Sequence, residues 1–305
     1  MRSSLPVTET RWRQEYRQHR YLEFASPQDL HDRLSDIVVN AYTIDRNGKY
    51  QMIVQADQWC EKLTHLKEEI TLRQIELSSP PLLKYTAAIR AAELWDSVDV
   101  SRGDYLLKFG KREHMADLLS KGRLRICEPE HYADSRFNSA IFDTECEFLQ
   151  ESIGATIKVP PGRDYSIPQD QWLSGPVLGT LKRTSRYEGR AYIACFAMKY
   201  EFRLFEDFEA NSCVVIRDPL RFLRAIKEWS DVYLADWVFS FDHVAYRDPF
   251  QPTKEVDVLY TKHFKYSYQR EFRMAWEQDK NGQPPPEPTF IELGPLTNYC
   301  DLLVL

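Results

Sequence analysis

The chain has 305 residues, of which 43% are hydrophobic and 28% charged, a balance typical of a folded globular protein that buries a sizeable core. The net charge of −6 argues against a generally basic nucleic-acid-binding platform. No apolar run reaches the roughly 18 residues of a membrane span, and the first 25 residues are polar where a secretory signal would be apolar. We therefore expect an intracellular, cytoplasmic protein with no membrane contact.

Cysteine and histidine spacing predicts no metal site. The six cysteines are scattered and include no Cys-x-x-Cys pair, so the sequence predicts neither a disulfide framework nor a zinc site. His114, His131 and His243 likewise have no close metal-ligand partner in the sequence. Cys195 lies in an apolar run, where a packing role is expected rather than a nucleophilic one.

Residues 1–102 have a mainly helical pattern. Ser26-Pro27 offers an N-cap followed by a first-turn proline, which predicts a helix start. A second helix is predicted from Trp59, where apolar residues recur at three- and four-residue steps, and a third after Pro81. The sequence of this region does not indicate its role.

Residues 103–305 are strand-rich with a few helices, which indicates an α+β fold. No G-x-G-x-x-G or Walker loop occurs, so classical dinucleotide-binding and P-loop folds are not expected. Residues 131–148 are interpreted as a loop leading into a helix, and residues 154–190 as a long irregular insertion. The predicted strands cover 105–109, 124–127, 190–197, 212–217, 239–246, 290–293 and 301–305.

Residues 266–276 alternate with a period of two, which predicts a β-strand. One face is apolar and carries Tyr266, Tyr268, Phe272, Met274 and Trp276. The opposite face is polar and carries Gln269, Glu271 and Arg273. The apolar face is expected to pack on a core.

Two interpretations of the polar face remain open. It is either a solvated sheet face, or the wall of a cleft in which Glu271 accepts a ribose hydroxyl and stabilises the positive charge of a breaking glycosidic bond. In the second case Gln269 would orient the acceptor. Arg273 would hold Glu271 ionised or bind a phosphate, or it forms only a surface ion pair.

Four short segments, taken in order, resemble one family. They are Leu-Lys-Phe at 107–109, Phe-Asn at 137–138, Cys-Phe at 195–196 and Tyr-Gln-Arg-Glu-Phe-Arg at 268–273. The order resembles a bacterial family of domains of unknown function whose late motif is Tyr-Glu-x-Glu-x-Arg. That family is related to ADP-ribosyltransferase-like toxins and phage-defence effectors. The resemblance covers residues 103–305 and leaves residues 1–102 unexplained.

The resemblance implies a split β-sheet ADP-ribosyltransferase-like domain that holds NAD in a cleft, preceded by the mainly helical region. Lys108 would bind the dinucleotide from the first strand, with Phe109 beside it as a further cofactor contact. Tyr266 or Tyr268 would stack on nicotinamide. Asn138 would hydrogen-bond the ribose or the nicotinamide amide, or else cap the following helix.

The same resemblance implies that Glu271 is the catalytic carboxylate and that Gln269 faces the acceptor. In such enzymes Gln-x-Glu tends to accompany acceptors other than arginine, including asparagine or a nucleobase. The implied function is transfer of ADP-ribose from NAD to an intracellular macromolecule, protein or nucleic acid, or hydrolysis of NAD. The protein would act as a toxin or as an antiphage effector in abortive infection, with Arg273 supporting the site.

A hypothesis of a different class is a non-catalytic module that binds a nucleotide or a protein within a defence or regulatory complex. Residues 1–102 would then dock an antitoxin or another partner of that complex. The two hypotheses differ in what they require of Glu271. Only the enzyme needs its carboxylate in a concave pocket beside bound NAD.

Overall fold

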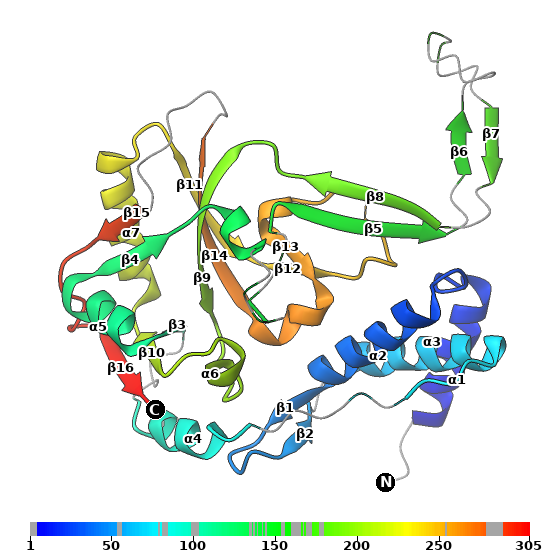
Figure 1. Ribbon diagram of the computed structural model, residues 1–305, viewed down its shortest axis with the longest axis horizontal. Coiled ribbons are helices and arrows are strands. Elements are labelled where there is room, and N and C mark those ends of the chain that lie inside the picture. Colours follow the sequence, from blue (N-terminus) through cyan, green and yellow to red (C-terminus); the bar gives the residue numbers. More distant parts are fainter. Residues whose placement is uncertain are drawn as a thin grey trace.

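The computed structural model describes most of the chain and shows a mixed α+β fold, as the sequence predicts (Figure 1). Two parts are visible: a helical N-terminal part and a larger part built on a six-stranded sheet. Among the described helices, none is both long and apolar enough to cross a bilayer. The described residues are 5–53, 57–78, 80, 85–98, 104–133, 136, 138, 140–141, 143, 145–153, 156–159, 166, 168, 173–176, 180–253, 255–278 and 289–305.

The N-terminal part is a set of packed helices with a small hairpin. Its elements are α1 (Leu5–Gln18), α2 (Pro27–Ala41), β1 (Tyr42–Ile44), β2 (Tyr50–Met52) and α3 (Asp57–Arg73). The predicted cap is confirmed, because the Ser26 side chain accepts a hydrogen bond from the backbone N–H of Asp29 in a capping box. Leu22, Leu30 and Leu66 are fully buried in the core that these helices share.

The helix α4 (Ala88–Asp96) leaves this bundle and packs against the larger part. Ala91 lies in one apolar cluster with Leu107, Leu204 and Val215, which belong to the larger part. The third predicted helix is therefore present, beginning at Ala88. The N-terminal region thus contributes to two separate hydrophobic cores.

The main sheet is antiparallel at every described pairing and has the strand order β11-β14-β9-β3-β10-β16. Helices α5 (Arg112–Lys121) and α7 (Pro219–Tyr233) pack with its one face, together with the paired strands β4 (Arg123–Ile126) and β15 (Thr289–Glu292). Helices α4 and α6 (Leu204–Asp207) pack with the other face. The strands are β3 (Leu106–Gly110), β9 (Arg190–Ala197), β10 (Ser212–Ile216), β11 (Val238–His243), β14 (Glu271–Gln278) and β16 (Cys300–Val304).

The six-stranded sheet splits between the strands β3 and β9. Over these two fully described strands, the register contains one residue pair, Leu107 opposite Ala197, whereas β9 and β14 pair over eight positions. The Lys108 ammonium donates a hydrogen bond of 2.8 Å to the Cys195 carbonyl and so bridges the gap by a side chain. The six strands therefore form two three-stranded halves that diverge from one contact.

The strand predicted over residues 266–276 begins only at Glu271, so the prediction is wrong for its first half. Residues Phe264–Gln269 form a 3₁₀ helix, η5, and Arg270 has a left-handed backbone with φ 43°. The cause is a tertiary contact, since Asn40 of α2 accepts from the Tyr268 N–H and donates to the Lys265 carbonyl. The alternation holds from Glu271 onward.

Two other predictions are corrected. Residues 131–148 lead into a strand, β5 (Glu147–Ile153), after a 3₁₀ turn η1 (Pro129–Ala133), because period-two alternation prevails over helical spacing there. The stretch predicted as an irregular insertion contains β6 (Thr156–Val159), β7 (Leu173–Pro176) and β8 (Thr180–Arg186). These form the hairpins β5–β8 and β6–β7, the latter projecting at the upper right of Figure 1.

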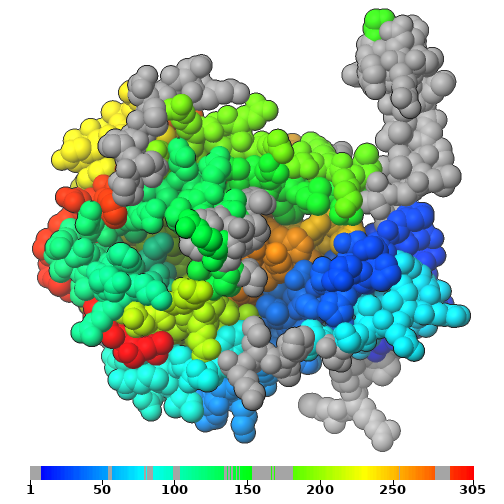
Figure 2. Space-filling model, viewed as in Figure 1, coloured from blue at the N-terminus to red at the C-terminus, as the bar shows by residue number. Residues whose placement is uncertain are grey.

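A buried ion cluster fastens α2 and α3 to the larger part. Both Arg33 guanidinium NH₂ groups donate to Asp248, at 2.9 and 2.7 Å, and the Lys62 ammonium donates at 2.6 Å. Asp248 follows β12 (Ala245–Arg247), which pairs in parallel with β13 (Thr261–His263) after the 3₁₀ turn η4 (Val258–Tyr260). In Figure 2 the blue and cyan N-terminal surface accordingly lies against the orange surface that precedes β14.

Replacing Asp248 by Asn should lower the free energy of unfolding by about 3–5 kcal/mol, because two buried cations lose their counter-ion. Asp96→Asn removes an exposed pair with Arg46 and should cost less than about 1 kcal/mol. Denaturant unfolding of both variants measures the difference. Equal losses would contradict the role given to Asp248.

Two glycines allow a matched test of the α5 terminus. Gly122 ends α5 with φ 65°, and a Cβ there would lie 2.3 Å from the Gly294 carbonyl oxygen. Gly294 has φ 75° and open space around its Cβ position. Gly294→Ala should cost about 1–2 kcal/mol from backbone strain, and Gly122→Ala at least about 1 kcal/mol more from the clash. Thermal unfolding that ranks the two variants equally would refute the close approach.

Candidate active site at the split of the sheet

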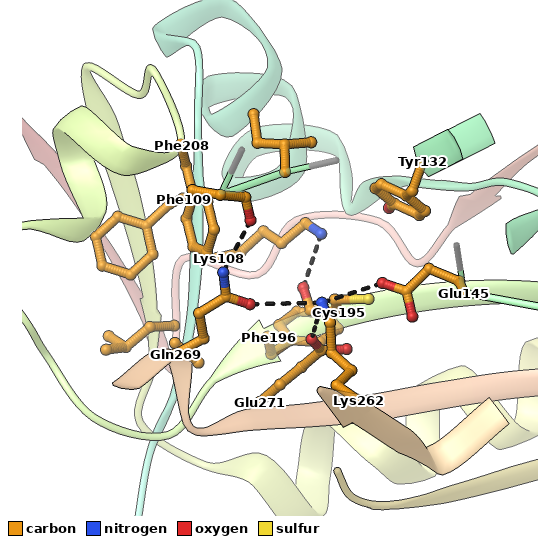
Figure 3. Close-up of a pocket in the computed structure, with 14 residues that line it drawn as sticks. Lys108, Phe109, Tyr132, Glu145, Cys195, Phe196, Phe208, Lys262, Gln269 and Glu271 are labelled. Carbon is orange, nitrogen blue, oxygen red and sulfur yellow. Dashed lines mark hydrogen bonds and ion pairs between the residues drawn. The ribbon is translucent and has the colours of Figure 1, made fainter. Parts of the chain in front are cut away.

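A pocket of about 240 Å³ opens where β3 and β9 part (Figure 3). Residues of β3, β9 and β14 form its wall, and segments around Tyr132, Ala140 and Phe208 complete it. The strand divergence creates the space, because side chains from both halves of the sheet reach the same gap. The lining includes Lys108, Phe109, Glu145, Cys195, Phe196, Lys262, Gln269 and Glu271.

Glu271 is the first residue of β14, and its carboxylate lies in this pocket. Its Oε1 accepts from the Arg273 Nε at 2.7 Å, and its Oε2 accepts from the Lys262 Nζ at 3.1 Å. Its backbone N–H donates to the Tyr246 hydroxyl at 2.8 Å. Side chain and backbone are therefore both held, although only 5% of the residue's surface is exposed.

Further buried charges extend this arrangement into a cluster. The Lys262 ammonium lies 3.1 Å from Glu145 and 3.6 Å from Asp143, and the Arg273 Nη2 lies 2.5 Å from the second Glu145 oxygen. We call these two cations and the carboxylates of Asp143, Glu145 and Glu271 the charge cluster. Three carboxylates against two cations leave one net negative charge when all are ionised. The Lys108 ammonium in the same pocket balances that charge, so a positive charge that develops in the pocket would be stabilised by its closeness to the Glu271 carboxylate rather than by a net charge.

The mutual pairing keeps the cluster ionised. Burial favours the protonated acid at Glu271, but Arg273 and Lys262 outweigh burial and lower its pKa to about 2. Burial likewise favours the neutral amine at Lys262, yet Glu145, Glu271 and Asp143 hold the Lys262 pKa well above its usual value. Burial raises the pKa of Asp143 to about 6, which places that carboxyl nearest to titration at neutral pH.

The carboxylate of Glu271 retains capacity for a ligand. A carboxylate has about four acceptor positions. Arg273, Lys262 and the Cys195 thiol occupy three of them. One position therefore remains for a hydroxyl donor that enters the pocket. Burial raises the pKa of the Cys195 thiol well above its usual value, which disfavours a nucleophilic thiolate there.

Gln269 lies beside Glu271 but comes from the 3₁₀ helix η5 rather than from the strand. Its amide nitrogen donates to the Ala140 carbonyl at 2.8 Å, and its amide oxygen lies 3.5 Å from the Lys262 Nζ. Asn138 shapes the same wall, because its side-chain oxygen accepts from the backbone N–H groups of Ala140 and Ile141. These contacts stabilise a turn, and among the described residues no helix begins directly after Asn138, so the predicted helix cap is not observed.

Aromatic rings flank the polar groups. In Figure 3, Phe109 and Phe208 lie on one side of Gln269 and Lys108, and Tyr132 lies on the other. The rings of Phe109 and Phe208 have centroids 6.1 Å apart, and the Lys108 ammonium lies 5.2 Å from the centroid of Phe196. The pocket therefore combines flat apolar walls with a charged floor, as sites for heteroaromatic ligands do.

The structure brings four of the predicted site residues together and separates the others. Lys108, Phe109, Gln269 and Glu271 line the pocket. The solvated-face interpretation is wrong, because Gln269 is 3% and Glu271 5% exposed. Arg273 is fully buried behind Glu271 and is absent from the described lining.

The two tyrosines predicted to stack on nicotinamide lie elsewhere. Neither Tyr266 nor Tyr268 is among the described residues that line this pocket. The Tyr266 ring is buried with the Lys262 ammonium 4.8 Å from its centroid, and the Tyr268 ring lies under the Arg203 guanidinium at 3.8 Å. The aromatic residues that line the pocket are instead Phe109, Phe196, Phe208 and Tyr132.

Sequence reasoning missed two essential members of the cluster. Lys262 precedes Glu271 by nine residues, and Glu145 lies before β5, so neither stands at a spacing that a helix or strand makes meaningful. They approach Glu271 only through the tertiary fold. The one available signal was the acidic run that contains Asp143 and Glu145 in an otherwise apolar stretch.

Comparison with known proteins adds no assignment: no protein-family model, curated protein or solved structure matches this chain. Within the described ranges, no group of three or more His, Cys, Asp or Glu side chains is arranged to hold a metal ion. Any function for this pocket must therefore be argued from its geometry and charge.

The lowered pKa of Glu271 predicts a pH-dependent share of stability. Because the folded pKa, about 2, lies below the usual 4.5, the stabilisation is complete above pH 4.5 and is lost as pH falls toward 2. It amounts to roughly 3 kcal/mol. The difference in unfolding free energy between the wild type and Glu271→Gln should shrink over that range. A difference that stays constant from pH 6 to pH 2 would contradict the pairing.

Proposed function

We propose that the protein is an NAD-dependent ADP-ribosyltransferase-like enzyme that cleaves the nicotinamide–ribose bond in the pocket at the split of the sheet. The observation that carries the proposal is Glu271, an ionised and immobilised carboxylate with one free acceptor position in a concave site. Cleavage of that bond develops positive charge on the ribose, which a fixed carboxylate stabilises more strongly than it stabilises the ground state.

The fold supports the proposal. The resemblance at 268–273 implies a split β-sheet domain, and the divergence of β3 from β9 at the Leu107–Ala197 pair is consistent with one. The predicted first-strand cation, Lys108, borders the same pocket as Glu271. Two residues predicted from separate motifs thus meet at one cavity.

The size of the pocket limits what it admits. About 240 Å³ is less than the 300–1,000 Å³ of typical small-molecule sites, so the nicotinamide–ribose end would enter and the rest of the dinucleotide would lie outside. A second cavity of about 470 Å³ shares Lys108, Phe109 and Tyr132 with the first and is bordered by Arg123 and Arg125. Its basic residues suit the diphosphate of the same molecule.

The acceptor would be an intracellular macromolecule, protein or nucleic acid, or water if the enzyme only hydrolyses NAD. Gln269, which lies beside Glu271, would orient the acceptor, and to do so its amide would exchange its contact with the Ala140 carbonyl for one with the acceptor. A toxin or antiphage effector would have its activity restrained, either by its own chain or by a partner. Residues 1–102 are the region not required for the pocket lining and are available for such a partner.

A non-catalytic nucleotide- or protein-binding module is the second candidate. The observation that favours it is that both Glu271 oxygens are already paired, as in a purely structural buried ion network. Such a module would bind a ligand in the pocket without consuming it. Turnover of NAD separates the two candidates.

The decisive experiment incubates the purified protein with NAD labelled in its adenylate phosphate and a cell lysate, which is then divided into protein and nucleic-acid fractions. Label in either fraction identifies transfer, and free nicotinamide without label identifies hydrolysis. Glu271→Gln should reduce either activity by about 10²- to 10³-fold. A folded Glu271→Gln variant that turns NAD over at the wild-type rate would exclude the assignment of Glu271.

Glu145→Gln is the matched control. It removes an equally buried carboxylate from Lys262 and Arg273, so it should lower the thermal midpoint about as much as Glu271→Gln does. It should nevertheless keep NAD turnover within about tenfold of the wild type. If both variants lost activity equally, Glu271 would act through stability alone. If the wild type left NAD unchanged, the binding module would be the better account.

A further inference from the structure

A second large pocket lies at the junction of the two parts of the molecule. It has a volume of about 680 Å³, well inside the range of small-molecule sites. Its walls come from α2, α3 and β1 on one side, and from β12, η5 and the segment 198–203 on the other. We call it the junction pocket. Among the described residues, none lines both this cavity and the pocket at the sheet split.

The junction pocket carries an excess of positive charge. Four cations line it, Lys62, Arg203, Arg247 and Arg270, against two described carboxylates, Glu201 and Asp248, which leaves a balance of +2. Both carboxylates are already neutralised. Asp248 pairs with Arg33 and Lys62, and Glu201 pairs with Lys199. The excess therefore points to an anionic ligand.

The two exposed cations have no counter-ion. Lys62 is paired with Asp248, and Arg203 is paired with Asp207 at 2.6 Å. Over the part of the chain that the structure describes, Arg247 and Arg270 form no ion pair and no side-chain hydrogen bond. Two guanidinium groups on one cavity provide the planar donors that bind phosphate best.

Arg270 also holds a backbone conformation that favours glycine. Its φ is 43°, and its carbonyl accepts from the Met198 N–H at 2.9 Å, which fixes the turn before β14. A non-glycine residue costs about 1–2 kcal/mol there. The backbone at Arg270 is therefore fixed by its surroundings, which sets where its exposed side chain leaves the turn.

Half-buried tyrosines complete the lining. Tyr42, Tyr246 and Tyr268 border the cavity, and each is partly exposed as a residue. Aromatic faces next to cations are the means by which proteins bind a base and its phosphate together. A simple inorganic anion would make no use of the rings.

We propose that the junction pocket is a binding site for a nucleotide, with its phosphate on Arg247 and Arg270 and its base against the tyrosines. The ligand is either a free nucleotide or a nucleotide unit of a single-stranded nucleic acid, which share this chemistry. The proposal is independent of NAD cleavage, since it concerns another cavity.

The junction pocket is linked to the pocket at the sheet split through the residues at the start of β14. Gln269 and Glu271 line the pocket at the sheet split, whereas Arg270 between them lines the junction pocket. Tyr246 lines the junction pocket and accepts the backbone hydrogen bond of Glu271. A nucleotide held by Arg270 and Tyr246 therefore contacts both residues that fix the start of β14.

Binding of ATP and of a 5′-phosphorylated single-stranded RNA hexamer to the full chain, measured by calorimetry, tests the proposal. Arg270→Gly and Arg247→Ala should each weaken binding by about 10- to 100-fold, the value of a hydrogen bond to a charged group. Arg270→Gly should fold at least as stably as the wild type, because glycine relieves the strain at φ 43°. Adenosine, which lacks phosphate, should bind far more weakly than ATP.

Two controls locate the site. Arg224→Ala removes an exposed arginine on α7, and Lys108→Ala alters the first pocket; both should leave binding unchanged. If the hexamer bound more tightly than ATP, the natural ligand would be a nucleotide unit of a nucleic acid. If ATP bound more tightly, it would be a free nucleotide. Wild-type affinity in Arg270→Gly, loss of binding in Lys108→Ala, or no binding of either probe at millimolar concentration would overturn the proposal.

Discussion

The charge cluster around Lys262 is the interaction on which the candidate site depends. Glu145, Lys262, Glu271 and Arg273 are buried and Asp143 is half-buried. The buried members would not remain ionised without their partners, because desolvation of a lone charge costs more than the fold can supply. Lys262 contacts three carboxylates from two separate segments, Asp143 and Glu145 before β5 and Glu271 at the start of β14. The cluster therefore acts as a tertiary constraint that fixes the Glu271 carboxylate where the sheet divides.

The split of the sheet supplies the space that the cluster faces. A continuous sheet would bring β3 and β9 into full register and fill the gap with backbone hydrogen bonds. Here the pairing stops at Leu107 and Ala197, and Lys108 restores a single bond across the opening. The same lysine thus limits the width of the gap and places a cation at the pocket. Lys108 therefore has a structural role and also lies in the candidate ligand site.

The N-terminal helices take part in this arrangement. Asn40 of α2 holds the backbone of η5, and Arg33 with Lys62 holds Asp248 beside β12. These contacts explain why the chain leaves helical geometry at Arg270 and enters β14 at Glu271. The junction pocket lies along the same contacts, so a ligand there would act on elements that already position the carboxylate.

The sequence predicted what depends on local pattern. The Ser26 cap, the strand at 190–197 and the apolar face of Phe272, Met274 and Trp276 follow from short-range periodicity, and all are present. The 3₁₀ helix before Glu271 was missed because Asn40, more than 220 residues away, imposes it. Local propensity cannot register such a contact.

The residues of the candidate site likewise fall into those that short motifs predict and those that only the tertiary fold reveals. Glu271, Gln269 and Lys108 were identified because short motifs carry them, and they do share one pocket. Glu145 and Lys262 have no motif, and their importance is visible only once the fold brings five charges together. The predicted tyrosines are absent from the described pocket lining for the same reason, since Tyr266 and Tyr268 lie in the 3₁₀ helix η5 rather than in the strand.

A crystal structure of Glu271→Gln soaked with NAD tests the central claim most directly. The variant keeps the shape of the pocket and slows cleavage, so intact dinucleotide should accumulate in the crystal. The account predicts a nicotinamide ring in the pocket at the split of the sheet, against Phe109 or Phe208, with a ribose hydroxyl within hydrogen-bond distance of residue 271. A dinucleotide bound elsewhere, or an empty pocket at saturating NAD, would contradict it.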